Sequence, residues 1–245
     1  MGDQINLPIR QQHIMEDNIT SAMDDDLSLL STWPQRAWLL LGCTSVSISF
    51  AMSIIGAFNS NMWFKPILAG LFGYIFADLA TGFFHWAVDN YGDVSTPFVG
   101  YIIGAFLNHH QRPSLTTKNQ FANLNYPPAQ GVFFILLPID FACNSPIVHA
   151  FAGTFFGCIM FSLQFHAWAH TAKSRLPRVV VVLQGIGVLA SPAKHALHHR
   201  PPYNNSYCMV SGVWNAFLNK LRVFEAMEML LFYMFSVRPR SWNNT

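Results

Sequence analysis

The sequence predicts an all-α fold: a polytopic membrane helical bundle of about four spans, with further helices lying along the membrane interface. Three observations lead to this prediction. The 245-residue chain is 52% hydrophobic and only 11% charged, a composition typical of polytopic membrane proteins. It contains several apolar runs that reach or approach the length of a bilayer span. Its Lys and Arg residues gather on one side when these runs are threaded as alternating spans.

Residues 1–32 are expected to form a mobile acidic tail ahead of the membrane domain, residues 33–245. The tail holds six Asp and Glu residues against one basic residue, Arg10, whereas the remainder holds thirteen Lys and Arg against six acids. The tail has no apolar run and is therefore not a secretory signal peptide. It is too acidic to fit an organelle transit peptide well. The basic remainder indicates anionic lipid headgroups rather than nucleic acid, for which no motif is present.

Four apolar runs are the candidate spans. Residues 37–58 are free of charge and would form about 33 Å of helix. Residues 66–84 form the second run, which is interrupted by Asp78. Residues 146–165 form another, rich in the small residues that allow close helix contact. Residues 129–143 would form only about 22 Å of helix. Taken alone, this last run could either cross the membrane or re-enter it.

The distribution of basic residues favours four spans. If residues 129–143 cross, His85 and His166 both emerge on the side of the N-terminal tail. Lys65 then stands on the opposite side, and the tail side receives Arg112, Lys118, Lys173, Arg175, Arg178, Lys194 and Arg200. This asymmetry is typical of a cytoplasmic or stromal face. Three shorter apolar segments are predicted to lie along the interface on that side: residues 97–107, 176–190 and 221–237.

Eight of the ten histidines fall on this face, at the ends of spans or just beyond them: His85, His109, His110, His166, His170, His195, His198 and His199. His166 and His170 are spaced i,i+4, as are His195 and His199, so each pair shares one face of a helix. Such pairs on neighbouring helices can enclose a metal, and imidazole suits iron, zinc and copper. Two histidines are expected to take no part: His149, near the opposite end of its span, and His13 in the tail.

Two acids are expected to join this cluster. Asp78 precedes His85 by two helical turns, and we expect it to accept a hydrogen bond from the outer nitrogen of a metal-binding imidazole. Asp89 is spaced i,i+4 from His85 and is expected either to bind the metal or to accept such a hydrogen bond. Lys194 and Arg200 flank the last three histidines and are expected to face phosphate headgroups.

The number of histidines favours two metal ions. The run HAWAH (166–170) has the histidine spacing of a zinc protease helix but carries Ala167 where that motif has its glutamate base. A bis-histidine haem site would leave the adjacent histidine pairs surplus, and a single zinc needs only three or four ligands. Two irons with O2 beside a bilayer would suit oxidation of an unactivated C–H bond in a lipid tail.

Several long motifs resemble those of a known family, the Kua/plasmanylethanolamine desaturase family of membrane lipid desaturases. They are HWAVDNYGD (85–93), FLNHH (106–110), QFHAWAH (164–170) and KHALHHRPPYNNSYCMVSGVWN (194–215). Three further runs are similar to its plant branch, the chloroplast fatty acid desaturase 4 type: residues 31–38, 73–97 and 237–242. The resemblance covers roughly residues 31–242 and makes residues 33–245 an expected membrane lipid desaturase domain.

The resemblance implies a fatty acyl-lipid desaturase that uses O2, two electrons and a histidine-bound, non-haem di-iron centre. For the plant branch it implies trans-3 desaturation of palmitate in phosphatidylglycerol, in a chloroplast membrane, with a ferredoxin-like electron donor. All eight clustered histidines occupy matching positions. Three alternatives remain open: an ether-lipid desaturase, a lipid hydroxylase of the same di-iron type, and a metal-binding membrane protein or transporter. A transporter would be expected to carry its polar ligands near mid-span.

Overall fold

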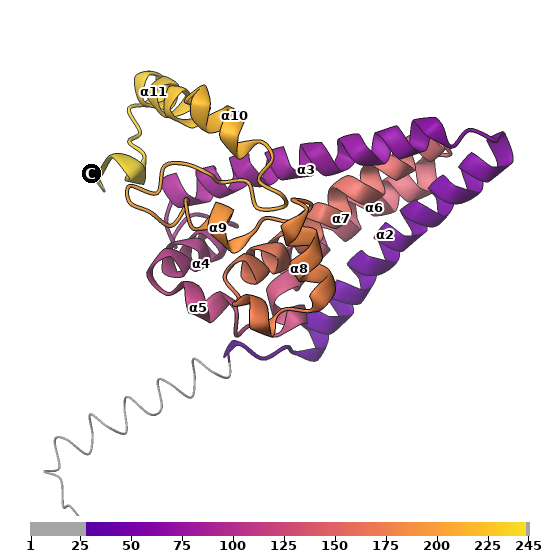
Figure 1. Cartoon of the computed structure of the whole chain (residues 1–245), viewed down its shortest axis with the longest axis horizontal. Helices are drawn as coiled ribbons and strands as arrows, with labels where there is room; N and C mark the ends of the chain where they lie inside the picture. The colour runs from indigo at the N-terminus through magenta and orange to yellow at the C-terminus, as the bar shows by residue number, and fades with distance from the viewer. Residues whose placement is uncertain (1–27, 244–245) are drawn as a thin grey trace, which may run out of the picture.

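The computed structural model describes residues 28–243, which are all-helical with no strand in that range (Figure 1). Four long helices form an elongated bundle: α2 (Trp33–Ser60), α3 (Phe64–Asn90), α6 (Phe121–Ala142) and α7 (Pro146–Ala169). The shorter elements are α4 (Gly100–Gln111), α5 (Pro113–Thr116), η1 (Lys173–Arg175), α8 (Arg178–Gly185), α9 (Pro192–His195), α10 (Asn215–Lys220), α11 (Val223–Phe235) and η2 (Arg240–Asn243). The predicted fold class is confirmed. Most of the expected acidic tail, including His13, lies outside the described residues.

Local sequence sets the ends of the long helices. At the start of α2, the backbone N–H of Thr32 donates to the side chain of Gln35 at 2.8 Å, as part of a capping box. The helix ends at Asn61, whose left-handed φ of 51° stops further helical hydrogen bonding. The side chain of Ser145 caps α7, and Pro146 occupies its first position, where a missing N–H costs nothing.

The bundle is an α2–α3 hairpin with α6 and α7 lying between its arms (Figure 1). α3 packs along α7, and α2 packs along both α6 and α7. The bundle core consists of Leu39, Val46, Ala122, Ala129, Val132, Leu136, Ala152 and Met160. Glycine permits the close approach of α3 to α7, because a Cβ at Gly73 would lie 2.6 Å from the carbonyl oxygen of Phe151.

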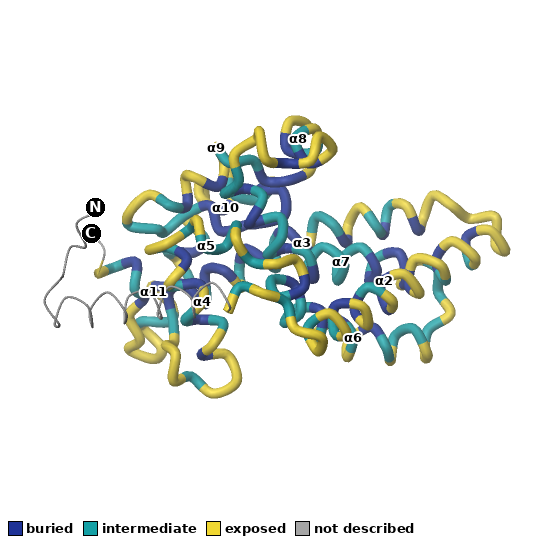
Figure 2. The backbone as a smooth tube through the Cα atoms, turned by 90° about the horizontal axis from the view of Figure 1, so that it is seen from below, coloured by how far each residue is buried: buried dark blue, intermediate teal, exposed yellow. Residues whose placement is uncertain are grey.

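Three helices, α2, α3 and α7, are long and apolar enough to cross a membrane. The part of the bundle far from the shorter elements is largely exposed in the isolated chain (Figure 2). Its exposed side chains are large and apolar, among them Ile54, Ile55, Phe58, Phe64, Ile67, Leu71 and Phe72. A continuous apolar surface of this kind is unfavourable in water and fits the hydrocarbon of a bilayer.

The fourth predicted span begins earlier than its apolar run. α6 starts at Phe121 and has 22 residues, about 33 Å of helix, although Pro127, Pro128 and Pro138 lie inside it. It packs against α2 and α7 and turns into α7 at Pro146. α6 thus brings the chain back along the bundle, as the topology argument requires. The count of four spans stays a prediction, because α6 is not among the three helices that are apolar enough.

As predicted, α3 and α7 end at the same end of the bundle, where the ring centroids of His85 and His166 are 5.5 Å apart. Two of the three predicted interfacial segments, residues 97–107 and 221–237, largely form α4 and α11. The third, residues 176–190, is helical only as far as Gly185. The backbone turns at Gly187, which has a φ of 80°, and the segment continues without helix from there.

We expect Gly73→Ala to destabilise the bundle, because its new methyl group would overlap the α7 backbone. Overpacking of this kind costs about 1–3 kcal/mol. Gly131→Ala is the matched control, since a Cβ there meets nothing within 4 Å and Ala is the better helix former. Thermal unfolding in detergent should show a lower Tm for Gly73→Ala and an equal or higher Tm for Gly131→Ala. Equal Tm values for the two variants would contradict the close α3–α7 contact.

Candidate metal centre

Histidines from α3, α4, α7 and the α9 segment converge at one end of the bundle. With one aspartate they form two groups, in each of which the ligand atoms lie within 4.8 Å of one another. The five-histidine group consists of His109, His166, His170, His195 and His199. The Asp89 group consists of His85, Asp89, His110 and His198. The structure therefore brings together all eight histidines that the sequence singled out.

In the five-histidine group, more ring nitrogens meet than hydrogen bonds can satisfy. The Nε2 atom of His170 lies 2.9 Å from that of His109, 3.1 Å from that of His166 and 2.9 Å from that of His195. A neutral imidazole nitrogen carries either one N–H or one lone pair, so it can satisfy only one such partner. A shared cation, to which every nitrogen offers a lone pair, satisfies them together.

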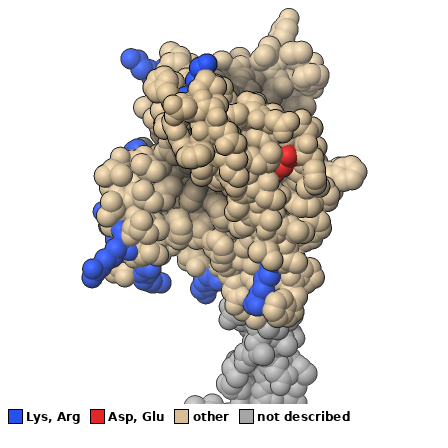
Figure 3. Space-filling model, turned by 90° about the vertical axis from the view of Figure 1, so that its right-hand side faces the viewer, with Lys and Arg blue, Asp and Glu red and all other residues tan. Residues whose placement is uncertain are grey.

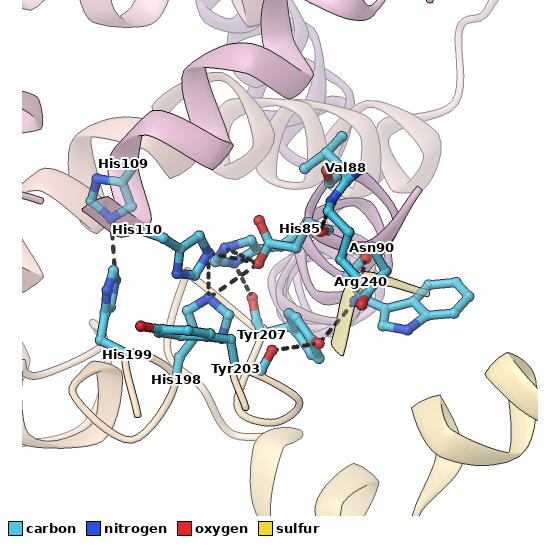
Figure 4. A network of polar contacts seen from close by, with 12 residues as sticks. His85, Val88, Asn90, His109, His110, His198, His199, Tyr203, Tyr207 and Arg240 are labelled. Carbon is cyan, nitrogen blue, oxygen red and sulfur yellow. Dashed lines mark hydrogen bonds and ion pairs between the residues drawn. The ribbon is translucent and has the colours of Figure 1, made fainter. Parts of the chain in front are cut away.

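The Asp89 group is built around one carboxylate oxygen (Figure 4). Asp89 Oδ2 lies 3.2 Å from His85 Nε2, 3.0 Å from His110 Nε2 and 3.2 Å from His198 Nε2. The carboxylate comes from the last turn of α3, one turn after His85. His110 comes from the end of α4, and His198 from the turn that follows α9. A negative oxygen and three nitrogens thus face one small volume.

Backbone carbonyls fix which nitrogens carry lone pairs. His85 Nδ1 lies 3.0 Å from the carbonyl oxygen of Tyr207, and His198 Nδ1 lies 2.9 Å from that of Asn205. A carbonyl only accepts, so each Nδ1 donates and each Nε2 holds the lone pair. Both lone pairs then point at the Asp89 carboxylate, which is unfavourable unless a cation lies between them. His85 Nε2 is indeed buried without a hydrogen-bond partner. The residues present therefore fit a metal ion.

Four histidines outside the spanning helices have a lowered pKa: His109, His170, His198 and His199. Burial, reinforced by neighbouring imidazoles, lowers the pKa of His109 to about 2 and that of His199 to about 2. Burial likewise lowers the pKa of His170 to about 4 and that of His198 to about 4. At pH 7 these rings are therefore deprotonated, and their lone pairs are available to a metal.

Asp78 does not make the contact expected of it. Its Oδ1 accepts hydrogen bonds from the backbone N–H groups of Ser211 at 2.7 Å and Gly212 at 2.9 Å, and its Oδ2 accepts from Trp214 at 3.4 Å. The carboxylate is fully buried beneath the loop that carries the carbonyl of Tyr207. Asp78 therefore anchors this loop, and backbone carbonyls take the role predicted for Asp78.

The remaining predicted positions lie apart from the two groups. Lys194 Nζ donates to the carbonyl oxygen of Ser211 at 3.4 Å, so Lys194 braces the same loop, while Arg200 is exposed. His149 is buried among other partners: its Nε2 lies 2.8 Å from the carbonyl oxygen of Cys143, and its Nδ1 lies 3.4 Å from Asp140 Oδ1. It belongs to neither metal group.

Sequence reasoning missed Arg240, which caps the end of α3. Its Nε donates to the carbonyl oxygen of Asp89 at 2.7 Å. Its other nitrogens donate to the carbonyls of Val88 at 2.9 Å and Tyr91 at 3.1 Å, and to that of Gly92. These carbonyls have no partner within the helix. The run VRPRSW (237–242) was the available signal, but nothing in its spacing connects it with α3.

A buried carboxylate holds the C-terminal segment in place. Glu228 of α11 accepts hydrogen bonds from Trp86 Nε1 at 3.1 Å, Ser241 Oγ at 3.2 Å and Trp242 Nε1 at 3.0 Å. It thereby joins α11 to α3 and to the residues that follow Arg240. The C-terminal segment is in this way fastened against the helix that supplies His85 and Asp89.

We expect Arg240→Gln to destabilise the fold by about 1–3 kcal/mol, because carbonyls at the end of α3 lose their donors. Metal bound by the Asp89 group should fall more than metal bound by the five-histidine group, since Asp89 lies in that last turn. Metal analysis and thermal unfolding of the purified protein test both effects. Arg238→Gln is the control, because the Arg238 guanidinium lies over the Phe232 ring, 5.5 Å from its centroid. Equal metal content in both variants would contradict this role.

Comparison with known proteins agrees with this geometry. A family model described as a lipid desaturase domain matches residues 74–242. Fatty acid desaturase 4, chloroplastic, of Arabidopsis thaliana is 53% identical over 212 residues, which cover 86% of this chain and 66% of that protein. A second Arabidopsis protein, fatty acid desaturase 4-like 2, chloroplastic, is 52% identical over 224 residues, which cover 91% of this chain and 80% of that protein. This chain thus spans just under two thirds of the first relative.

A more distant relative is plasmanylethanolamine desaturase 1 of Mus musculus, which is 30% identical over 190 residues. These residues cover 71% of this chain and 68% of the mouse protein. No solved structure matches. The family model covers well over half of the chain and includes all eight clustered histidines. The resemblance found in the sequence motifs is confirmed: the chain belongs to the lipid desaturase domain family.

Proposed function

We propose that the protein is a membrane lipid desaturase that uses O2 and two histidine-bound irons to place a double bond in a lipid-linked acyl chain. The observation that carries the proposal is the pair of adjoining ligand groups at one end of an apolar bundle. Eight imidazoles and one carboxylate converge there, and the chain belongs to a desaturase family. Imidazole and carboxylate ligands suit iron.

The reaction removes two hydrogen atoms from adjacent methylene groups. One O2, two electrons and two protons are consumed, and a carbon–carbon double bond and two waters are formed. The two irons would supply the activation of O2 and the oxidising power. This chain's own residues hold and orient that centre. The carbonyls of Tyr207 and Asn205 fix the tautomers of His85 and His198, and Thr116 holds His109 through a 2.6 Å contact.

The proposed substrate is palmitate in phosphatidylglycerol, desaturated at the trans-3 position in a chloroplast membrane with electrons from a ferredoxin-like donor. Support comes from the names of the Arabidopsis relatives, which are chloroplastic fatty acid desaturases, and from charge. Between residues 28 and 243, Arg222 is the one Lys or Arg in an ion pair with a carboxylate. Basic side chains stand along the edges of the face in Figure 3, where acidic ones are nearly absent. Lys194 and Arg200 are exposed as well, and an excess of exposed basic side chains favours an anionic headgroup.

The alternatives predict different products from the same site. An ether-lipid desaturase would form a vinyl ether, as the name of the mouse relative suggests for that protein. A lipid hydroxylase would leave an alcohol. A metal transporter is disfavoured because the ligands gather at one end of the bundle, and because Asp78, the acid closer to the middle of α3, binds backbone amides.

Lipid profiling tests the proposal directly. The protein is expressed in a host that supplies phosphatidylglycerol and ferredoxin, and its acyl chains are analysed for double-bond position and geometry. A new trans-3 chain is the expected result. An unchanged acyl profile with a new vinyl ether would transfer the assignment to ether lipids, and formation of the full product without iron would refute the mechanism.

A histidine variant tests the metal assignment. His198→Ala removes a ligand of the Asp89 group and should abolish desaturation, while iron falls from about two per chain toward one. The protein should still reach the membrane, because the long helices are unaffected. His149→Gln is the control, since His149 is a buried histidine of neither group. It should keep both its iron and its activity. Equal iron in His198→Ala and the unaltered protein would contradict the assignment.

A further inference from the structure

A half-open cavity of about 190 Å³ lies directly beside the five-histidine group, lined by residues of α5 and the segment after it, of α6 and α7, and of the segment that follows α7. Two residues that line the cavity adjoin histidines of this group. Thr116 lines the cavity, and its Oγ1 lies 2.6 Å from His109 Nδ1. Ala167 also lines it and follows His166 in the chain. The cavity and the five-histidine group therefore share a wall.

The chemistry of this cavity differs from that of the bundle. Its polar lining consists of hydroxyl, amide and guanidinium groups, from Thr116, Thr117, Asn119, Gln164, Thr171 and Arg175. No carboxylate lines it. Five of these side chains already form hydrogen bonds within the protein. A ligand that carries oxygens could use their remaining N–H groups and lone pairs, whereas an acyl chain could not. The lining instead suits an anionic ligand that also carries hydroxyl or ester oxygens.

Arg175 supplies the positive charge at the cavity. It is exposed, and within the part of the chain that the structure describes it forms no ion pair with a carboxylate. A guanidinium binds phosphate oxygens through two parallel hydrogen bonds. The volume corresponds to about six waters at ~30 Å³ each, enough for a phosphate or a glycerol unit and too small for a lipid tail.

We propose that this cavity binds the glycerol-phosphate headgroup of the substrate, an anionic phospholipid, with Arg175 on the phosphate. The inference rests on the proposed function and adds the means by which the lipid is chosen and placed. The cavity lies at the end of the bundle where α7 ends, which is the depth at which lipid headgroups are expected. A headgroup fixed there presents the acyl carbons closest to its ester to the metal ligands, while carbons farther along the tail remain in the bilayer. The cavity thus determines both lipid class and double-bond position.

Binding of short-chain lipids to the iron-loaded full chain in detergent tests the site. Dihexanoyl phosphatidylglycerol should bind at least tenfold more tightly than dihexanoyl phosphatidylcholine, whose choline ammonium offsets the phosphate charge. Arg175→Gln should remove that preference, since it removes the positive charge at the cavity. Arg178→Gln is the matched control, an exposed arginine three residues away that does not line the cavity. Thr117→Val, which removes a lining hydroxyl and keeps the charge, should weaken binding without abolishing the preference.

Equal binding by Arg175→Gln and Arg178→Gln would overturn the proposal. So would glycerol 3-phosphate binding as tightly as the short lipid, since the site would then serve a soluble phosphate. Activity assays separate this proposal from the proposed function. Arg175→Gln should raise KM for phosphatidylglycerol far more than it lowers kcat, and should loosen the position of the double bond. Headgroup-selective binding by a protein that forms no double bond would support the headgroup site and refute the desaturase assignment.

Discussion

The structure depends on one arrangement: the imidazole lone pairs of His85 and His198 directed at the carboxylate of Asp89. Such an arrangement is repulsive by itself and favourable around a cation. Two backbone carbonyls enforce it, because the Nδ1 atoms of His85 and His198 must donate to them. α3, α4 and the turn after α9 converge on this carboxylate. The neighbouring five-histidine group repeats the principle with imidazoles alone.

α3 is the helix to which the site is fastened. Asp78 of α3 binds the loop that supplies the Tyr207 carbonyl. His85 Nδ1, two turns later, donates to that carbonyl, and Asp89 lies in the last turn of the helix. Arg240 then caps the turn through four carbonyls. The helix is therefore restrained on both sides of His85 and Asp89. Its close contact with α7, made possible by Gly73, brings His166 to the same place.

The sequence sufficed for the helical class, three spans and the histidine set, because each depends on local pattern: apolar runs, i,i+4 spacing and charge asymmetry. The sequence did not predict which residues far apart in the chain contact one another. Whether Asp78 meets an imidazole or an amide depends on the path of the loop carrying Ser211 and Gly212, which no periodicity encodes. Arg240 is distant in sequence from the turn that it caps. The apolar run at 129–143 did not indicate that α6 begins at Phe121, because the first two turns of that helix contain two asparagines and two prolines.

The His85 nitrogen that is buried without a hydrogen-bond partner would link a bound metal to the stability of the folded chain. Without a cation, the packed lone pairs and the Asp89 carboxylate oppose folding; with one, the same atoms favour it. A metal that binds only the native state adds about 2.7 kcal/mol of stability at a hundredfold excess over its Kd, a large share of the stability of an ordinary domain. The quantity of folded protein in the membrane should therefore follow metal supply, so that scarcity reduces the protein itself as well as its activity.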